Sequence, residues 1–219
     1  MIGASLLVAA TLGYLFGSIP VGVIVARLWG NVDVRLMGSQ HTGGTNVMRA
    51  VGKRAGLLVI VLDGLKAAVA VALATFVFGN KVVEVQGLLV HYQVAQVVAG
   101  LGAVVGHNWS VFLRFRGGRG VATFFGSWIP LFPVATLLGA EVLAIIALRT
   151  RYMSLASLSS IFATLALLAT LTLRYDFPPI YLTYSVVSAG VVIYQHRDNI
   201  ARLLSGRERR LGETAEAGS

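Results

Sequence analysis

The chain of 219 residues contains no cysteine, and only 12% of its residues are charged. The lack of cysteine excludes disulfides, a thiolate nucleophile and thiolate metal ligands. The scarcity of charge, with 56% hydrophobic residues and a mean hydropathy of +0.78, excludes an ordinary soluble domain. The composition therefore predicts an integral membrane protein.

Basic residues are also absent from the N-terminal segment, where no Lys or Arg precedes Arg27. A signal peptide needs a basic start, so we expect this apolar segment to remain as the first membrane span. The net charge of +9 comes from residues in short loops between apolar runs, which reports membrane topology and not binding to nucleic acid. We expect one domain over residues 1–206 and a polar, disordered cytoplasmic tail over residues 207–219.

Several apolar stretches reach the roughly 20 residues that a helix needs to cross a bilayer. The clear candidates are residues 2–28, 55–78, 87–105, 152–173 and 178–194. A longer stretch, residues 121–148, is interrupted at residues 129–133, where the sequence IPLFP contributes two prolines.

Fifteen of the 18 Lys and Arg residues fall into four groups beside these stretches. Under the positive-inside rule the four groups are cytoplasmic. They are Arg27, Arg35, Arg49, Lys53 and Arg54; Arg114, Arg116 and Arg119; Arg149 and Arg151; and Arg197, Arg202, Arg207, Arg209 and Arg210.

The stretch 121–148 begins beside Arg119 and ends beside Arg149, so it must cross the membrane an even number of times. We therefore predict a helical hairpin with a short first arm. The resulting fold class is an all-α polytopic membrane protein with about seven transmembrane helical segments, one short or partly penetrating, the N-terminus outside and the C-terminus cytoplasmic. The alternative is one tilted or kinked helix, which would place Arg149 and Arg151 outside.

Three polar stretches, residues 38–49, 106–123 and 196–202, are unusually rich in Gly, Asn, His and Arg. Glycine lets backbone N–H groups point toward one position, and the guanidinium of Arg adds a positive charge that can donate two parallel hydrogen bonds. Such stretches therefore favour the binding of phosphate. Three of them on one face of a bilayer predict a phosphate-handling site. The first is not a P-loop, because the Walker spacing is absent.

The second polar stretch contains Gly-Gly-Arg-Gly at a predicted helix start, residues 117–120. The N-terminal N–H groups and the guanidinium together favour an anion. Its aromatic residues, Trp109, Phe112 and Phe115, could frame an acyl chain or form an ordinary interfacial belt. In the third stretch, His196 and Asn199 share a helix face by i, i+3 spacing.

Other polar residues have open interpretations. Asp63 and Lys66 lie at i, i+3 inside a span and are either an internal ion pair or part of the site. Ser154 and Ser157 favour tight helix packing but could face the site. No spacing supports a metal site, even with His41 in the first polar stretch and a histidine in the second.

The order of motifs resembles a known family. GSIPxG is followed by a Gly-Ser loop that ends in TNxxR, then by GHN with FxGGRGVAT, and finally by HRxNIxRLxxGxE. This pattern, from Gly17 to Glu208, is similar to that of the acyl-phosphate:glycerol-3-phosphate acyltransferases (PlsY) of bacterial phospholipid synthesis.

The resemblance implies a multi-pass enzyme of the bacterial cytoplasmic membrane, with its active site on the cytoplasmic face. It would move a fatty acyl group from acyl phosphate to the 1-hydroxyl of sn-glycerol 3-phosphate, giving lysophosphatidate and inorganic phosphate without a cofactor. A functional link to an enzyme that produces acyl phosphate follows. The resemblance points to catalytic His196, Asn199, Arg119 and Arg49 and to substrate-binding Ser39, Thr45, Asn46, His107, Asn108, Gly117, Gly118 and Gly120; we add Ser154 and Ser157 as substrate-binding candidates.

Two departures from the family pattern stand out. The first loop reads GSQHTGGTN where the family usually has GSGNPGATN, so Gln40 and His41 are expected to change its local backbone. Arg119 replaces a usual Lys, which keeps the charge but alters the geometry of phosphate contact.

The chemistry of an acyl phosphate needs no covalent intermediate, because phosphate is already a good leaving group. The alcohol must still lose a proton, either to His196 or to the acyl phosphate, which we favour. The rival functions are a transporter of a phosphorylated solute and a structural membrane subunit. A transporter would more naturally show an internal repeat, which we do not find, and a structural subunit would leave the three polar stretches unexplained.

Overall fold

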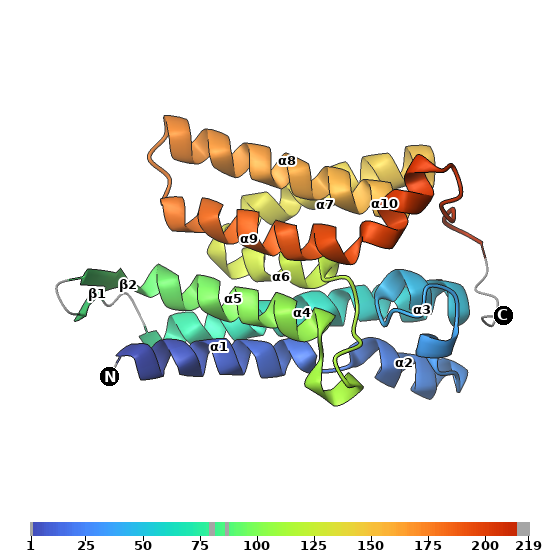
Figure 1. Ribbon diagram of the computed structural model, residues 1–219, viewed down its shortest axis with the longest axis horizontal. Helices are drawn as coiled ribbons and strands as arrows, with labels where there is room; N and C mark the ends of the chain where they lie inside the picture. The colour runs from blue at the N-terminus through green and yellow to red at the C-terminus, as the bar shows by residue number, and fades with distance from the viewer. Residues whose placement is uncertain (1, 79–81, 86–87, 214–219) are drawn as a thin grey trace.

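The helices of the computed structural model, which describes residues 2–78, 82–85 and 88–213, run nearly parallel to one long axis (Figure 1). The longer ones are α1 (Ile2–Ser18), α4 (Lys53–Phe78), α5 (Tyr92–Asn108), α6 (Val121–Leu131), α7 (Pro133–Thr150), α8 (Met153–Arg174) and α9 (Pro179–Gln195). Short helices at one end are α2 (Val21–Gly30), α3 (Gly44–Ala50) and α10 (Arg197–Leu204), with 3-10 turns η1 (Val34–Leu36) and η2 (Val111–Leu113). The start of α1 and the end of α10 lie at opposite ends of the bundle.

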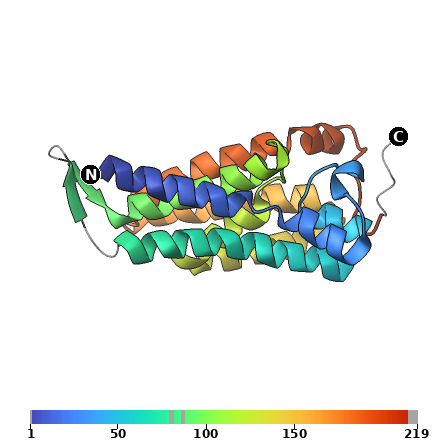
Figure 2. The same cartoon turned by 90° about the horizontal axis from the view of Figure 1, so that it is seen from below.

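One part of the chain departs from the expected all-α fold. Strands β1 (Val82–Val85) and β2 (Leu88–His91) pair antiparallel and form a hairpin at the end opposite the C-terminus (Figures 1 and 2). The expected span 87–105 is therefore wrong at its start, because its helix begins only at Tyr92. Three of the four residues of β1 are β-branched valines, which favour an extended strand over a helix.

Among the described residues, five regions are long and apolar enough to cross a membrane. They are Ser5–Gly30, Lys53–Val77, Tyr92–Leu113, Pro133–Thr150 and Met153–Arg174. The helices α6 and α9 are shorter, with 11 and 17 residues. The chain is thus a helical multi-pass membrane protein, and the number of seven crossings stays a prediction.

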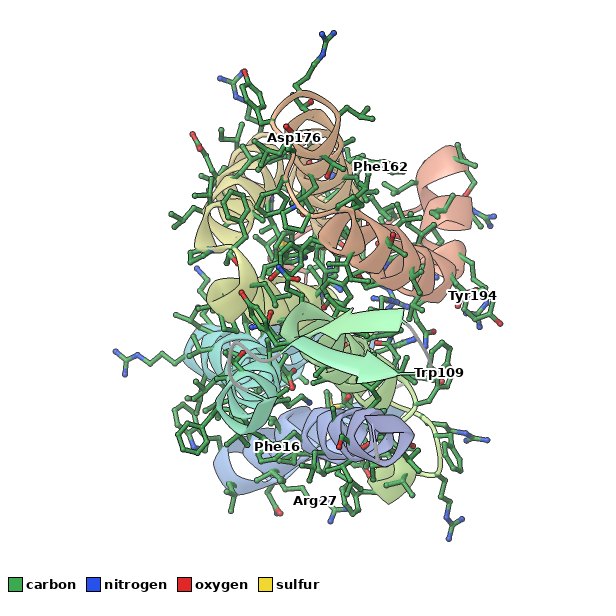
Figure 3. The ribbon with its side chains drawn as sticks, turned by 90° about the vertical axis from the view of Figure 1, so that its left-hand side faces the viewer. Phe16, Arg27, Trp109, Phe162, Asp176 and Tyr194 are labelled. Carbon is green, nitrogen blue, oxygen red and sulfur yellow. The ribbon has the colours of Figure 1, made fainter. Side chains whose placement is uncertain are left out.

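The outer surface of the bundle is apolar, as contact with lipid requires. Large hydrophobic side chains such as Phe76, Leu148 and Phe162 are exposed to the surroundings of the protein. Figure 3 shows Phe162 projecting from the side of the bundle. A soluble protein rarely exposes so many large apolar side chains along its helices.

The first apolar stretch forms two helices instead of one, because Pro20 interrupts it between α1 and α2. Proline lacks the N–H that would donate to the carbonyl of Phe16 and continue the helix, and the chain turns so that the Ile19 carbonyl accepts from the N–H of Val21 at 2.9 Å. Lys66 Nζ donates to that oxygen at 2.9 Å. A lysine inside the neighbouring span thereby stabilises the break.

The stretch 121–148 reverses direction at Phe132. The Thr136 hydroxyl donates to the carbonyl of Phe125 at 2.9 Å, and Gly139 packs against the Phe125 ring. In one continuous helix, residues 125 and 136 would lie about 16 Å apart along the axis. The helices α6 and α7 therefore form the predicted hairpin, and the alternative of one kinked helix is wrong.

The basic groups of the first loop, the α7–α8 connection and the C-terminal segment meet at one end of the bundle. Arg49 Nη2 lies 3.4 Å from the carbonyl oxygens of both Arg209 and Arg210. Arg151 Nη2 donates to the carbonyl of Leu211 at 2.7 Å. Arg151 thus lies at the same end of the bundle as Arg49, as the positions of the basic residues predicted.

The C-terminal segment Arg207–Glu213 differs from the expected disordered tail. Glu208 accepts hydrogen bonds from Ser154 and Asn199 and forms an ion pair with Arg202. One carboxylate in a polar segment is enough to anchor the chain when three donors surround it. Residues 214–219 lie outside the described residues.

Candidate active site

A cavity of about 520 Å³ opens at the basic end of the bundle, among α3, α4, α6, α7 and α8. Residues from all three polar stretches line it, so the structure brings together segments that are far apart in the sequence. The polar lining includes Ser39, His41, Thr45, Asn46, Arg49, Asp63, His107, Arg119, Gly120, Ser154, Ser157, His196, Asn199 and Glu208.

The side chain of Asn46 organises the first polar stretch. Its amide nitrogen lies 2.9–3.0 Å from the carbonyl oxygens of Val34, Met37 and His41, and its oxygen accepts from the N–H of Ser39 at 3.1 Å. These contacts use the whole amide. Asn46 therefore lines the cavity and also shapes the loop, and its expected role in binding substrate stays a prediction.

Gln40, one of the two departures in this loop, takes a backbone conformation that is open to glycine. Gln40 has φ of 58°, in the left-handed region that glycine adopts without cost. A residue with a Cβ pays about 1–2 kcal/mol for that conformation. The expected change of backbone is therefore not required, because Gln40 takes a glycine-like conformation.

The glycines of the second polar stretch seat its loop on the end of α5. Gly117 N–H donates to the carbonyl of Asn108 at 3.1 Å, and Gly118 N–H donates to that of His107 at 3.0 Å. A Cβ on Gly118 would overlap the His107 ring. Gly117, Gly118 and Asn108 are not among the residues that line the cavity, and their contacts hold the loop on the end of α5.

The same loop presents Arg119 and the start of α6 to the cavity. Gly120 has φ of 83°, which turns the chain into the helix, and Val121 and Ala122 line the cavity with it. The first N–H groups of a helix have no partner within the helix, so this end carries partial positive charge. An anion is favoured at that position.

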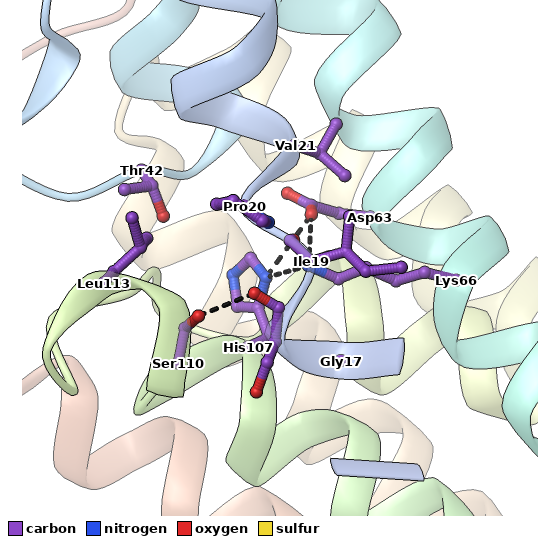
Figure 4. Close-up of a pocket in the computed structure, with 11 residues that line it drawn as sticks. Gly17, Ile19, Pro20, Val21, Thr42, Asp63, Lys66, His107, Ser110 and Leu113 are labelled. Atoms are coloured by element: carbon purple, nitrogen blue, oxygen red, sulfur yellow. Dashed lines mark hydrogen bonds and ion pairs between the residues drawn. The ribbon is translucent and has the colours of Figure 1, made fainter. Parts of the chain in front are cut away.

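A buried ionic cluster lies beneath the loop (Figure 4). Lys66 Nζ is 2.8 Å from Asp63 Oδ1 and 3.0 Å from His107 Nδ1, and Asp63 Oδ1 is 3.4 Å from His107 Nδ1. The interpretation of Asp63 and Lys66 as an internal pair is confirmed. The pair also holds His107, whose ring in turn supports Gly118.

His196 begins the third polar stretch with a fixed tautomer. Its Nδ1 lies 2.8 Å from the carbonyl oxygen of Val192, which can only accept, so Nδ1 carries the hydrogen. Nε2 is then left as an acceptor. Burial is the main reason that the pKa of His196 falls to about 4, so the imidazole is neutral near pH 7.

The two arginines of the cavity are not held by ion pairs to any of the described residues. Neither Arg49 nor Arg119 forms an ion pair within the described part of the chain, and both Nε atoms are buried without a hydrogen-bond partner. Burial, and then the charge of Arg202, lower the pKa of Arg119 to about 10. Burial also lowers the pKa of Arg49. Such uncompensated guanidinium groups favour a bound anion.

Glu208 is a site residue that the sequence reasoning left out. It connects Ser154 on α8 with Asn199 and Arg202 on α10 at 3.0, 2.7 and 2.9 Å. The only signal was the terminal Gly-x-Glu of the third motif. Ser154 is thus engaged with Glu208, while the Ser157 hydroxyl donates to the Met153 carbonyl at 2.7 Å.

The far wall of the cavity is apolar, which the sequence reasoning also did not resolve. Ile60, Val61 and Leu65 of α4 line it together with Phe125 and other apolar residues of α6 and α7. A polar mouth and an apolar interior suit a ligand with a charged head and a hydrocarbon chain.

Comparison with known proteins decides which family such a site belongs to. The family model described as "Glycerol-3-phosphate acyltransferase" matches residues 7–206. The chain belongs to this family. "Glycerol-3-phosphate acyltransferase 3" of Dehalococcoides mccartyi strain CBDB1 is 47% identical over 98% of this chain and 100% of its own length. A "Glycerol-3-phosphate acyltransferase" of Thermus thermophilus is 42% identical over 94% of this chain and 95% of its own.

Two solved structures of the glycerol-3-phosphate acyltransferase family share the fold. Both are crystal structures of PlsY (YgiH), an integral membrane glycerol 3-phosphate acyltransferase, one in a glycerol 3-phosphate form and one in a lysophosphatidic acid form. Their TM-scores are 0.80 and 0.79 at 38% and 37% identity, over 95% of this chain and 96% of theirs. The resemblance drawn from the motifs is thereby confirmed.

Proposed function

We propose that this chain transfers a fatty acyl group from acyl phosphate to the 1-hydroxyl of sn-glycerol 3-phosphate. The family supplies the glycerol 3-phosphate acyltransferase activity. The observation that carries the choice of donor is the cavity itself, where Arg49, Arg119 and the start of α6 adjoin an apolar wall. Both substrates bring a phosphate, and one also brings a hydrocarbon chain.

The reaction needs positioning and charge neutralisation more than it needs a nucleophile of the protein. The hydroxyl oxygen attacks the acyl carbonyl carbon, and a new ester C–O bond forms. The bond from that carbon to the bridging oxygen of the phosphate breaks, and the electron pair and the hydroxyl proton leave with inorganic phosphate. Cations held near the leaving phosphate stabilise its charge, so no cofactor takes part.

His196 orients the attacking alcohol in this proposal. Its Nε2 accepts a hydrogen bond from the 1-hydroxyl in the bound substrate, and the O–H then turns toward a phosphate oxygen of the acyl phosphate, which takes the proton as the ester bond forms. Asn199 Oδ1, which is buried without a partner among the described residues, offers a second acceptor nearby. Ser39 and Thr45 contribute hydroxyl groups at the cavity wall.

The membrane placement is also part of the proposal. Seven crossings, an outside N-terminus and a cytoplasmic C-terminus put the cavity on the cytoplasmic face of the bacterial cell membrane. Residues 1–206 form the one catalytic domain. A donor made inside the cell reaches that face directly, so an acyl-phosphate-producing enzyme is the expected supplier.

The test is an assay of the purified protein in detergent with palmitoyl phosphate and labelled glycerol 3-phosphate. Lysophosphatidate and inorganic phosphate should appear in equal amounts, and palmitoyl coenzyme A should give no product. Product from the coenzyme A ester but not from the phosphate would show that the donor is wrong. No product from either donor would overturn the proposed reaction.

A further inference from the structure

His41, in the first polar stretch, lines the cavity and bonds a backbone carbonyl through Nδ1, as His196 does. Its Nδ1 lies 2.6 Å from the carbonyl oxygen of Ser39. Because a carbonyl oxygen only accepts, Nδ1 carries the hydrogen and Nε2 keeps a lone pair. No hydrogen bond to Nε2 of His41 or of His196 occurs within the described part of the chain.

The loop holds this imidazole rigidly. The Asn46 amide donates to the backbone carbonyl of His41 at 2.9 Å, and the preceding Gln40 fixes the turn at φ of 58°. The Nδ1 bond to Ser39 then restricts the ring. A group preorganised in this way loses little entropy when a substrate binds.

Both imidazoles are neutral near pH 7. Burial, and then the charge of Arg119, lower the pKa of His41; Arg197 lowers it further, while the bond to Ser39 and the charge of Asp198 raise it. A neutral nitrogen with a lone pair does not attract a phosphate dianion. It accepts a hydrogen bond from an alcohol, and the arginines remain to bind phosphate.

Glycerol 3-phosphate has two hydroxyl groups beside its phosphate, and the cavity offers two such acceptor nitrogens. We propose that His41 accepts a hydrogen bond from the 2-hydroxyl while His196 accepts one from the 1-hydroxyl. This inference rests on the proposed function. It makes His41 a specificity residue that selects an alcohol at the central carbon of the acceptor substrate.

The arrangement discriminates against two close analogues that keep the phosphate and the reacting hydroxyl. 3-Hydroxypropyl phosphate lacks the 2-hydroxyl and leaves Nε2 of His41 unpaired. Dihydroxyacetone phosphate places a carbonyl oxygen there, so two acceptors face each other. Sites built to bind a substrate hydroxyl reject analogues without it, because a buried polar group is then left unsatisfied.

The experiment measures kcat/KM for the three acceptors with palmitoyl phosphate as donor. Wild-type protein should prefer glycerol 3-phosphate to both analogues by about tenfold or more. His41→Ala and His41→Leu, which puts a larger apolar side chain in place of the imidazole, should each lower kcat/KM for glycerol 3-phosphate about tenfold. Both variants should change kcat/KM for 3-hydroxypropyl phosphate less than about twofold. The control Gln40→Gly, in the same loop, should keep the wild-type preference.

Two results would overturn the proposal. One is a wild-type enzyme that uses 3-hydroxypropyl phosphate as well as glycerol 3-phosphate, which needs no variant to observe. The other is a folded His41 variant, checked by its thermal melting, that keeps the wild-type preference or loses activity equally with all three acceptors. If wild-type protein acylates none of them, the proposed function itself fails, which is a separate outcome.

Discussion

Arg49 and Arg119 are the residues on which phosphate binding should depend. Losing a charged hydrogen bond at a site poor in water costs about 1.5–3 kcal/mol, roughly ten- to a hundredfold in affinity. We therefore expect Arg49→Ala and Arg119→Ala to lower kcat/KM by at least about tenfold, and Arg119→Lys to keep much of the activity because it keeps the charge. The measurement is the steady-state assay on protein shown to be folded. Near-wild-type kcat/KM in both alanine variants would refute the phosphate assignment.

The lowered pKa of His196 gives a prediction about protonation. An ordinary histidine gains its proton as the pH falls through about 6.5, whereas burial holds the pKa of His196 at about 4. The neutral, hydrogen-bond-accepting form should therefore persist from neutral pH to about pH 5 and be lost only below that. A histidine NMR titration, with the His196 signal identified by its absence in His196→Gln, should show no change between about pH 5 and 8. A signal that titrates near the ordinary histidine pKa would contradict this.

His196→Gln separates an orienting role from a base. Glutamine keeps a hydrogen-bonding oxygen but cannot take a proton at neutral pH. If the acyl phosphate accepts the proton, the variant should retain measurable turnover with a raised KM for glycerol 3-phosphate. A folded variant that binds glycerol 3-phosphate normally but gives no turnover would show that His196 is the base instead.

For single residues, the sequence predicted which residue types lie together at the cavity, but not which contacts each side chain makes. Eleven of the fourteen expected site residues line the cavity, while Gly117, Gly118 and Asn108 are not among the residues that line it. The sequence could not show that the side chains of Asn46, Ser154 and Ser157 already make hydrogen bonds within the protein, because a motif does not reveal such bonds. Glu208 was missed because it lies in a polar C-terminal segment, and the sequence does not show that Ser154, Asn199 and Arg202 surround it in the fold.

At the scale of helices, α4 and α6 approach each other through Gly64 and Gly126. A Cβ on Gly126 would overlap the backbone of Gly64, so Gly126→Ala should push the helices apart and cost about 1–3 kcal/mol. The matched change Gly64→Ala meets its nearest atom, the Ala122 carbonyl oxygen, at an ordinary 3.4 Å. It should be neutral or slightly stabilising, because alanine favours helix over glycine. Thermal melting in detergent compares the two, and equal melting temperatures would refute the close approach.

The sequence was sufficient to predict some helix boundaries and not others. The reversal at Phe132 followed from the parity of basic residues around the stretch 121–148, a constraint on the whole element. The break at Pro20 and the start of α5 at Tyr92 could not be placed in this way. The first depends on Lys66 from another helix, and the second on strand pairing between β1 and β2.

At the scale of the whole molecule, the gathering of the basic residues at one end of the bundle determines how the protein lies in the membrane. Arg54, Arg116, Arg151 and Arg209 are exposed at the start of α4, in the loop before α6, after α7 and beyond α10. Arg174, also exposed, ends α8. In Figure 1, α8 runs away from the end of the bundle that holds α3 and α10, so Arg174, its last residue, lies toward the opposite end.

The orientation in the membrane can be tested by thiol labelling. Because the chain has no cysteine, a single introduced cysteine is the only position in it that a thiol reagent labels. Single cysteines at Arg54, Arg116, Arg151 and Arg209 should resist a membrane-impermeant thiol reagent in intact cells and react after the inner membrane is opened. The reason is that cationic loops are retained on the cytoplasmic side during insertion. A cysteine at Arg174 should react in intact cells and serves as the control. Reaction of the Arg151 position from outside would refute the seven-crossing topology, because the α6–α7 hairpin would then fail to return the chain to the cytoplasm.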